Sequence, residues 1–240
     1  MKYAIIAAGE GSRLSKEGIE QPKPLVELCG EPMMDRLVRI FTNCGATEIV
    51  VICNCLTNLV RIHLEELAMK RNTTQCPIRI VQQTTPSSMH SFYCLSPYLT
   101  KERFCLTTVD TVFKEDEFKK FIRHFEMSKN DGMMAVTDYV DDESPLYVGT
   151  DSNLNIKSFN DSKKETDRYI SGGIYCLTPK AITTLQRCIK EGTSRMRNFQ
   201  RALIEDGLQL QAYPFSKILD VDHASDIEKA ERFCKQGENE

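Results

Sequence analysis

The chain of 240 residues has no apolar run that approaches the roughly 18 residues needed to cross a membrane. Its first apolar stretch, residues 2–8, is too short for the apolar core of a signal peptide. Lys and Arg number 31 against 34 Asp and Glu, so the net charge is -3 and there is no broad basic field. We therefore expect a cytoplasmic protein that contacts no membrane and does not have nucleic acid as its main partner.

The chain also lacks the cysteine patterns of disulfide scaffolds and zinc fingers. Ten cysteines in 240 residues fall far below the density of a disulfide scaffold. Cys53 and Cys55 form one C-x-C, but no second pair stands at zinc-finger spacing and the four histidines are scattered. Most of the others lie in apolar runs, where they read as small core residues. The composition thus indicates reduced thiols in a globular protein.

No internal repeat and no linker rich in Pro, Gly or Ser divides the chain, so we expect one domain over residues 1–240. Short apolar runs alternate with helical patterns, which predicts an α/β fold with a mostly parallel sheet and helices on both faces. After about residue 140 the strands are spaced like those of a small antiparallel region. This change divides the domain into two lobes, at about 1–140 and about 141–240.

The expected elements come from hydrophobic periodicity. Residues Met34, Leu37, Val38 and Phe41, for example, recur on one face of a helix. Strands are expected over 2–7, 47–54, 77–81, 104–109, 132–138, 146–149, 154–159, 169–177 and 208–214. Helices are expected over 32–44, 115–128, 179–191, 194–206 and 224–235, with a further one carrying Leu59, Ile62 and Leu67.

A glycine-rich segment follows the first expected strand directly. Gly9 and Gly11 let the backbone approach a ligand closely, and consecutive N–H groups in such a turn can form an anion-binding nest. Arg13 adds a planar guanidinium that suits phosphate oxygens. The G-x-G-x-x-G fingerprint is incomplete, because Leu14 stands at its third glycine, and the Walker pattern is absent. A phosphate loop and an ordinary structural turn are both open at this point.

Lys23 stands between two prolines, ten residues beyond Arg13. Proline fixes its own φ and restricts the residue before it, so Pro22 and Pro24 hold the backbone of Lys23 in a preset position. Rigid presentation suits a lysine that must meet a phosphate better than one that only solubilises a surface. Together with the glycine-rich segment, it favours a phosphate-binding site.

Two aspartates are candidates for a magnesium site. Mg²⁺ prefers oxygen ligands, usually one or two carboxylates with substrate phosphates and water. Asp110 follows an apolar strand, at the carboxyl edge where open α/β sheets bind ligands, and the alternative is that it caps the next loop. Asp220 and Asp222 end an extended stretch before the last expected helix. Because side chains alternate along an extended chain, only one of these two need reach a metal.

These motifs, in this order, resemble those of the sugar-1-phosphate nucleotidyltransferases (sugar-nucleotide pyrophosphorylases) and their phosphocholine cytidylyltransferase relatives. The matching segments are A-A-G-x-G-S-R-L at 7–14, P-K-P-L at 22–25, and Gly30-Glu31-Pro32 before a helix. The similarity is strong over about residues 1–50 and traceable to Glu231. It implies a Rossmann-like (GT-A type) fold, with a nucleotide-binding half at about 1–140 and an acceptor-binding half at about 141–240.

The resemblance also implies roles for individual residues. Arg13 and Lys23 would contact the nucleotide phosphates as the catalytic residues. The residues placed against the nucleotide are Ala7, Ala8, Gly9, Gly11 and Ser12. In the family, one metal aspartate ends the fourth strand and another precedes the last helix, and Asp110 and Asp222 match these positions. A departure is Val109, where the family usually has glycine.

The segment after the third expected strand resembles the base-reading segment of the family. Gln82 and Ser88 are its candidate nucleotide contacts. Whether Gln82 or Gln83 faces the nucleotide depends on the strand register. A serine here also suits the N-cap of a helix, which is the alternative for Ser88.

The strand at 169–177 resembles the N-x-G-I-Y strand on the acceptor side of the family. Gly173 matches the pattern, and Ser171 replaces the asparagine. Relatives that act on sugars often carry an E-K segment just upstream, and this chain has none there. Asp161 is the candidate replacement as an acceptor contact, with a surface turn as the alternative. These departures put a standard hexose phosphate in doubt.

The sequence therefore predicts a magnesium-dependent enzyme that transfers a nucleoside monophosphate from a nucleoside triphosphate to a small phosphorylated acceptor, releasing pyrophosphate. A sugar-1-phosphate is the favoured acceptor, and a cytidylyltransferase acting on phosphocholine or a phosphonate is the alternative. A glycosyltransferase that uses nucleotide-sugars is disfavoured, because residues 108–110 read T-V-D and not D-x-D. A non-catalytic nucleotide-binding module is disfavoured because the charged candidates are all retained. Association into a homodimer is left open.

Overall fold

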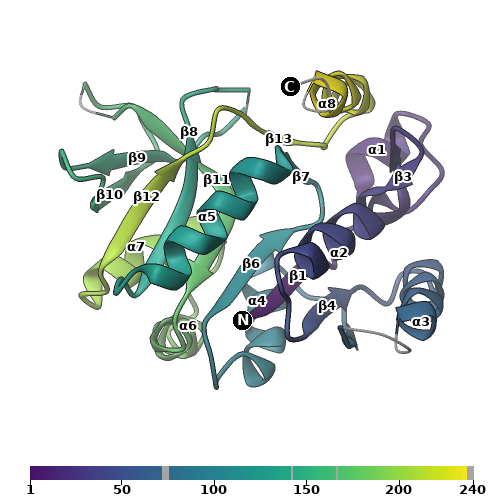
Figure 1. Cartoon of the computed structure of the whole chain (residues 1–240), viewed down its shortest axis with the longest axis horizontal. Coiled ribbons are helices and arrows are strands. Elements are labelled where there is room, and N and C mark those ends of the chain that lie inside the picture. Colours follow the sequence, from purple (N-terminus) through teal and green to yellow (C-terminus); the bar gives the residue numbers. More distant parts are fainter. Residues whose placement is uncertain (72–75, 142, 166, 237–240) are drawn as a thin grey trace.

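The computed structural model describes residues 1–71, 76–141, 143–165 and 167–236 (Figure 1). Strands from these ranges build one nine-stranded sheet. They are β1 (Lys2–Ala7), β4 (Ile49–Cys53), β5 (Ile78–Gln82), β6 (Phe104–Thr108), β8 (Gly132–Thr137), β9 (Tyr147–Thr150), β10 (Ile156–Asn160), β11 (Tyr169–Leu177) and β12 (Leu210–Pro214). The main path of the sheet is β10-β9-β11-β6-β1-β4-β5, with β8 beside β11 and β12 beside β8. The predicted strands are confirmed, with bounds that shift by one or two residues.

Strand β1 lies in the parallel half of the sheet. It pairs in parallel with β4 on one side and with β6 on the other, and β4 pairs in parallel with β5. Parallel strands end at the same edge, so the segments that follow β1 and β6 must lie close together. This register brings the glycine-rich segment after Ala7 next to Asp110.

Side chains along β1 alternate between two hydrophobic cores, because successive residues of a strand face opposite sides of the sheet. Tyr3 and Ile5 belong to one core, and Ala4 and Ile6 to the other. Helices α2 (Met33–Asn43) and α5 (Glu115–Met127) cover the first core and lie in front of the sheet in Figure 1. Helices α4 (Ser88–Leu95), α6 (Lys180–Lys190) and α7 (Met196–Glu205) cover the second. Helices on both faces are thus confirmed.

The second half of the sheet is largely antiparallel. Strand β11 runs antiparallel to β6, β8 and β9, and β9 pairs antiparallel with β10. Only β12 and β8 are parallel there. The predicted antiparallel region is therefore present, but it is not a separate sheet, since β11 enters the main sheet directly beside β6.

A short two-stranded ribbon, which the sequence did not predict, connects the segment after β6 to the segment before the last helix. Strand β7 (Thr111–Phe113) pairs antiparallel with β13 (Ile218–Asp220), and Val221 N–H donates to the Asp110 carbonyl at 3.1 Å. The ribbon holds the start of helix α8 (Ala224–Gln236) against the end of β6. Three-residue strands are too short to show a period of two, which is why the sequence did not reveal them.

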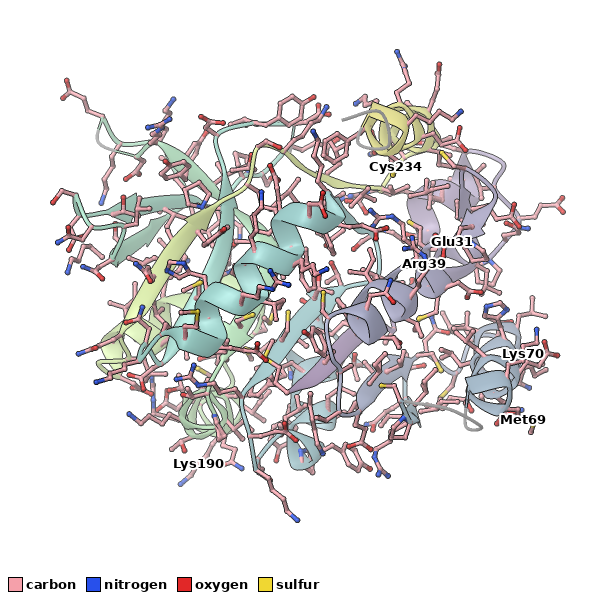
Figure 2. The ribbon with its side chains drawn as sticks, in the orientation of Figure 1. Glu31, Arg39, Met69, Lys70, Lys190 and Cys234 are labelled. Atoms are coloured by element: carbon pink, nitrogen blue, oxygen red, sulfur yellow. The ribbon has the colours of Figure 1, made fainter. Side chains whose placement is uncertain are left out.

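Lys23 lies in a 3₁₀ helix (Lys23–Leu25) that leads into a small hairpin of β2 (Glu27–Leu28) and β3 (Glu31–Pro32). Figure 2 shows Glu31 beside Arg39 of α2, and the Arg39 guanidinium also pairs with Glu115 of α5. Both carboxylates raise the pKa of Arg39. This three-residue bridge anchors the segment that carries Lys23 to two helices of the first core.

Helix α3 (Leu59–Arg71) packs at the outer edge of the sheet. It buries Val60 and Leu64, whereas Leu59 and Ile62 are 56% and 43% exposed. In the part of the chain that the structure describes, no helix combines the length and the apolar character required to span a membrane.

Candidate active site

Two cavities lie side by side at the edge of the sheet where β1 and β6 end. The first, of about 480 Å³, is lined by the glycine-rich segment, by residues 85–88 and by Asp110. The second, of about 430 Å³, is lined by residues of β11, β13 and the start of α8. Arg13 and Asp222 line both cavities, so these two residues mark the point where the contents of the cavities would meet.

The glycine-rich segment lines the first cavity. The lining includes the five predicted nucleotide contacts of this segment, Ala7, Ala8, Gly9, Gly11 and Ser12. Gly11 has φ +63°, a left-handed conformation that favours glycine, and a Cβ there would lie 3.1 Å from the Lys23 Cβ. The sequence therefore needs glycine at position 11 to form the turn and to let Lys23 approach. Helix α1 (Ser12–Lys16) begins directly after it and carries Arg13.

Lys23 lies between the two predicted metal aspartates. Its Nζ atom donates to Asp222 Oδ1 at 2.7 Å and to Asp110 Oδ2. Only 11% of its side chain is exposed. Burial opposes the charge on Lys23, but the two carboxylates outweigh burial and raise the pKa of its ammonium. Lys23 is thus a charged lysine in a half-enclosed site.

Asp110 has one carboxylate oxygen that nothing in the described chain satisfies. Oδ2 accepts from Lys23, whereas Oδ1 is buried and has no hydrogen-bond partner among the described residues. A buried carboxylate oxygen without a partner is costly unless a ligand supplies one. A cation bound at this oxygen would supply the missing partner.

Asp222 is tied to both predicted catalytic residues. It pairs with Lys23 and, through Oδ2, with Arg13 Nη1 at 2.9 Å. Burial tends to raise the pKa of Asp222, but the charges and hydrogen bonds of Lys23 and Arg13 lower it overall. The next turn is fixed by Asp226, whose Oδ2 accepts the backbone N–H groups of Asp222 and His223 at 3.2 and 2.9 Å. Asp226 thereby caps the start of α8 and orients Asp222.

Asp220 lies in the same acidic region, on the side of the second cavity. The residue is exposed at its surface, but the protein packed around it displaces part of the water that would hydrate the carboxylate. This desolvation and the charges of Asp110 and Asp222 raise the pKa of Asp220 to about 8. Within the described ranges, no group of three or more His, Cys, Asp or Glu side chains is placed to hold a metal. Asp220 and Asp222 both line the second cavity, and of these two aspartates Asp222 also lines the first.

Of the two residues predicted to contact the nucleotide base, Ser88 lines the first cavity and Gln82 does not. Ser88 lines it, together with Thr85, Ser87 and others. Ser88 is the first residue of α4, and the N-cap position belongs to Ser87, whose hydroxyl bonds His90 Nδ1 at 2.8 Å. Gln82 lies outside the lining and donates to Asn58 Oδ1 at 3.3 Å.

The predicted acceptor contacts are also only partly brought together. Ser171 lines the second cavity and its hydroxyl donates to Gln200 Oε1 at 3.0 Å. Gly173 is not in the lining; with φ +74° it lies within the irregular pairing of β11 with β8. The neighbouring Gly172 is in the lining instead. A Cβ on Gly172 would lie 2.2 Å from Ile218 Cδ1.

Asp161 does not line the second cavity. Its two carboxylate oxygens pair with Arg197 and Arg201, each at 2.7 Å, and these arginines lower the pKa of Asp161. Arg197 itself reaches the cavity. Sequence patterns did not single out this arginine, since it lies on α7, 36 residues from its partner.

Comparisons with known proteins find one family model and several relatives. A family model described as nucleotidyl transferase matches residues 2–237. Glucose-1-phosphate cytidylyltransferase of Salmonella typhimurium is 38% identical over 53 residues, a match that spans 22% of this chain and 21% of that protein. A Bacillus subtilis protein assigned as a glucose-1-phosphate cytidylyltransferase is 23% identical over 204 residues, 78% of each chain. The first of these relatives is therefore matched over only a small part of its length.

Two solved structures share the fold along nearly the whole chain. One, from Bacillus anthracis and assigned as a glucose-1-phosphate thymidylyltransferase, has a TM-score of 0.81 at 18% identity, covering 98% of this chain and 95% of that one. The other is the inositol-1-phosphate CTP transferase of T. maritima, with a TM-score of 0.75 at 17% identity and 97% coverage of both chains. They establish the mixed α/β, GT-A type fold that the sequence predicted.

Proposed function

Because this chain belongs to the nucleotidyl transferase family, we propose that it transfers a nucleoside monophosphate from a nucleoside triphosphate to a small phosphorylated acceptor. The observation that carries the proposal is the meeting of the two cavities at Arg13 and Asp222. A triphosphate in the first cavity and an acceptor in the second would present their reacting phosphates to the same pair of side chains. The product would carry the nucleoside monophosphate on the phosphate of the acceptor, through a new phosphorus–oxygen–phosphorus bridge, with pyrophosphate released.

The reaction needs positioning and charge neutralisation more than covalent chemistry. A phosphate oxygen of the acceptor attacks the α-phosphorus of the triphosphate, and the bond to the bridging oxygen of the pyrophosphate breaks. Arg13 and the backbone N–H groups of the glycine-rich segment hold the β- and γ-phosphates. Lys23 stabilises the charge that develops at the α-phosphate. Its low exposure strengthens that interaction, since charges act more strongly away from bulk water.

A divalent metal, with magnesium favoured by the carboxylate ligands, is part of this proposal. The unpartnered Asp110 Oδ1 supports it, as does Asp222 on the other side of Lys23. Asp110 and Asp222 would hold the ion. When bound, magnesium neutralises phosphate charge and makes the α-phosphorus more electrophilic.

For the acceptor, we propose a sugar-1-phosphate or a similar cyclic alcohol phosphate. The names of the relatives and of the solved structures support this class, since they refer to glucose-1-phosphate and inositol-1-phosphate. A cytoplasmic location belongs to the same proposal, as the sequence led us to expect.

A cytidylyltransferase that acts on an amino-alcohol phosphate or phosphonate is the second candidate. It is favoured by the lining of the second cavity, where Asp141 pairs with the ammonium of Lys229 and the Tyr139 ring faces that of Lys217, with Glu143 nearby in the lining. Acidic and aromatic side chains are the groups that recognise an ammonium. The absence of the E-K segment in the sequence is consistent with it.

A pyrophosphate-release screen tests the proposal. Each of the four common nucleoside triphosphates is combined with a panel of sugar-1-phosphates, inositol phosphate, phosphocholine and 2-aminoethylphosphonate. The proposal predicts release that requires both a triphosphate and one acceptor class, and that is lost in Asp222→Asn. Release that does not depend on any phosphorylated acceptor would contradict it.

A further inference from the structure

The carboxylate of Glu17, at the end of α1, binds the residue that follows Asp222. Glu17 Oε1 accepts a hydrogen bond from His223 Nδ1 at 2.6 Å, and Glu17 Oε2 accepts one from the backbone N–H of Ala224 at 2.6 Å. Glu17 is the C-terminal capping residue of α1, whereas Ala224 is the first residue of α8. One side chain thus binds both the imidazole and the start of the last helix.

These bonds fix which nitrogen of His223 faces the second cavity. A carboxylate only accepts hydrogen bonds, so the imidazole proton toward Glu17 is on Nδ1. The other nitrogen, Nε2, lies 3.8 Å from Glu143 Oε1, and both His223 and Glu143 line the second cavity. A partner at one nitrogen sets the orientation of the whole ring. Nε2 is therefore the polar atom of His223 that a molecule in this cavity can reach.

The position of His223 places it at the reacting end of that cavity. Its neighbour Asp222 lines both cavities, and the Asp222 carboxylate pairs with Arg13 of α1. Helix α1 is consequently joined to the segment before α8 at two points, Arg13–Asp222 and Glu17–His223. The second of these holds an imidazole next to Asp222, where the proposed function puts the acceptor phosphate.

We propose that His223 contacts the phosphate end of the acceptor through Nε2, and that Glu17 is the positioning residue that holds the ring for this contact. The inference rests on the proposed function, since it assigns a contact within the proposed acceptor cavity. A phosphate or phosphonate oxygen accepts from Nε2 when the ring is the imidazolium, which the Glu17 carboxylate stabilises, and a hydroxyl next to the phosphate donates to Nε2 when the ring is neutral.

Three substitutions distinguish the role of Nδ1 of His223 from that of Nε2. In His223→Asn the side-chain amide retains a donor near the position of Nδ1 and removes Nε2. In His223→Gln the longer amide reaches toward the position of Nε2 and gives up the bond to Glu17. Glu17→Gln keeps an acceptor for Ala224 but weakens the hold on the ring. Glu20→Gln, an exposed glutamate beyond α1, is the matched control.

The expected result is a selective effect on the acceptor. With the acceptor that turns over fastest in the screen, His223→Asn should raise the acceptor KM about tenfold or more, the cost of one hydrogen bond to a charged group. His223→Gln should recover part of this loss, and Glu17→Gln should raise the acceptor KM less than His223→Asn. The KM for the triphosphate should stay within about twofold. An unchanged acceptor KM, or equal changes in both constants, would overturn the inference and leave only a structural role.

A binding measurement distinguishes failure of the inference from failure of the proposed function. If no acceptor in the panel is turned over, the proposed function fails, and inorganic phosphate serves as the probe of His223. The imidazole signals of the four histidines are followed by NMR at constant pH, and the signal missing in His223→Asn identifies His223. The inference predicts that phosphate shifts this signal in the wild type and shifts it less in Glu17→Gln. A His223 signal that phosphate does not move would overturn the inference.

Discussion

The Nζ atom of Lys23 lies 2.7 Å from Asp222 Oδ1, although 199 positions separate the two residues in the chain. The contact joins the proline-flanked segment of the first half to the turn that starts the last helix. Asp110, at the end of β6, completes the arrangement by accepting from the same ammonium. One lysine therefore offsets the negative charge of two carboxylates at the junction of the two cavities.

Replacing Lys23 by alanine should abolish most turnover without unfolding the protein. The ammonium is the charged group aimed at the junction, and removal of one such group from an active site typically costs on the order of a hundredfold or more in kcat. Pyrophosphate release measures this loss, and circular dichroism reports whether the fold persists. Lys16→Ala, on the last turn of α1, is the control and should retain activity. A Lys23→Ala enzyme with the wild-type rate would remove Lys23 from the mechanism.

Magnesium should stabilise the wild-type protein against heat. An ion that binds only the folded state adds about 2.7 kcal/mol at a hundred times its Kd. Asp110→Asn replaces the carboxylate whose Oδ1 has no hydrogen-bond partner in the described chain, so the stabilisation should be lost. Differential scanning fluorimetry with and without magnesium measures the shift, and Asp116→Asn on the exposed side of α5 is the control. Equal shifts in wild type and Asp110→Asn would place the ion elsewhere.

Alanine at position 11 should damage both stability and turnover, while alanine at position 18 should damage stability alone. Both glycines have positive φ, at +63° and +90°, and each substitution costs roughly 1–2 kcal/mol for that reason. Only at Gly11 does the added Cβ also meet a neighbour, the Lys23 Cβ at 3.1 Å. Denaturant unfolding and pyrophosphate release separate the two effects. If both variants lose turnover equally, the approach of Lys23 to Gly11 is unimportant.

The wall of the second cavity depends on the absence of a side chain at Gly172. A Cβ there would lie 2.2 Å from Ile218 Cδ1, so Gly172→Ala should cost about 1–3 kcal/mol through overpacking. Ile218→Val removes the Cδ1 atom and should cost about 1 kcal/mol alone. The double variant should then lose less than the sum of the two, as coupled neighbours do. Strict additivity in urea unfolding would show that the two residues do not press on one another.

The contiguous motifs allowed the best predictions from the sequence. Strand β1 and the glycines after it fix a local geometry, and the parallel pairing of β1 with β6 then brings Asp110 to the same edge. The pairing of Arg13 and Lys23 with Asp222 required the family pattern. No local pattern in the last fifty residues indicates that the segment around Asp222 lies against the end of β6. That return depends on the β7–β13 ribbon, which is too short to be detected.

Residues whose role depends on a distant partner could not be predicted. Asp161 was a candidate acceptor contact, but Arg197 and Arg201 of α7 bind both of its oxygens, and no spacing in the sequence indicates this. Gln82 could not be oriented, because its direction depends on the register of β5. Glu17 and His223 carried no motif at all, and only the approach of α1 to α8 makes them neighbours.

The central claim is that the two cavities form one reaction site. The most direct test is to identify the product after incubation with a triphosphate labelled at the α-phosphorus and the active acceptor. Phosphorus-31 NMR and mass spectrometry should find one new compound in which the labelled phosphorus is linked to the acceptor phosphate, formed in equal amount to pyrophosphate. The compound should be absent in Asp222→Asn. Labelled monophosphate or diphosphate that forms without any link to the acceptor would contradict the account.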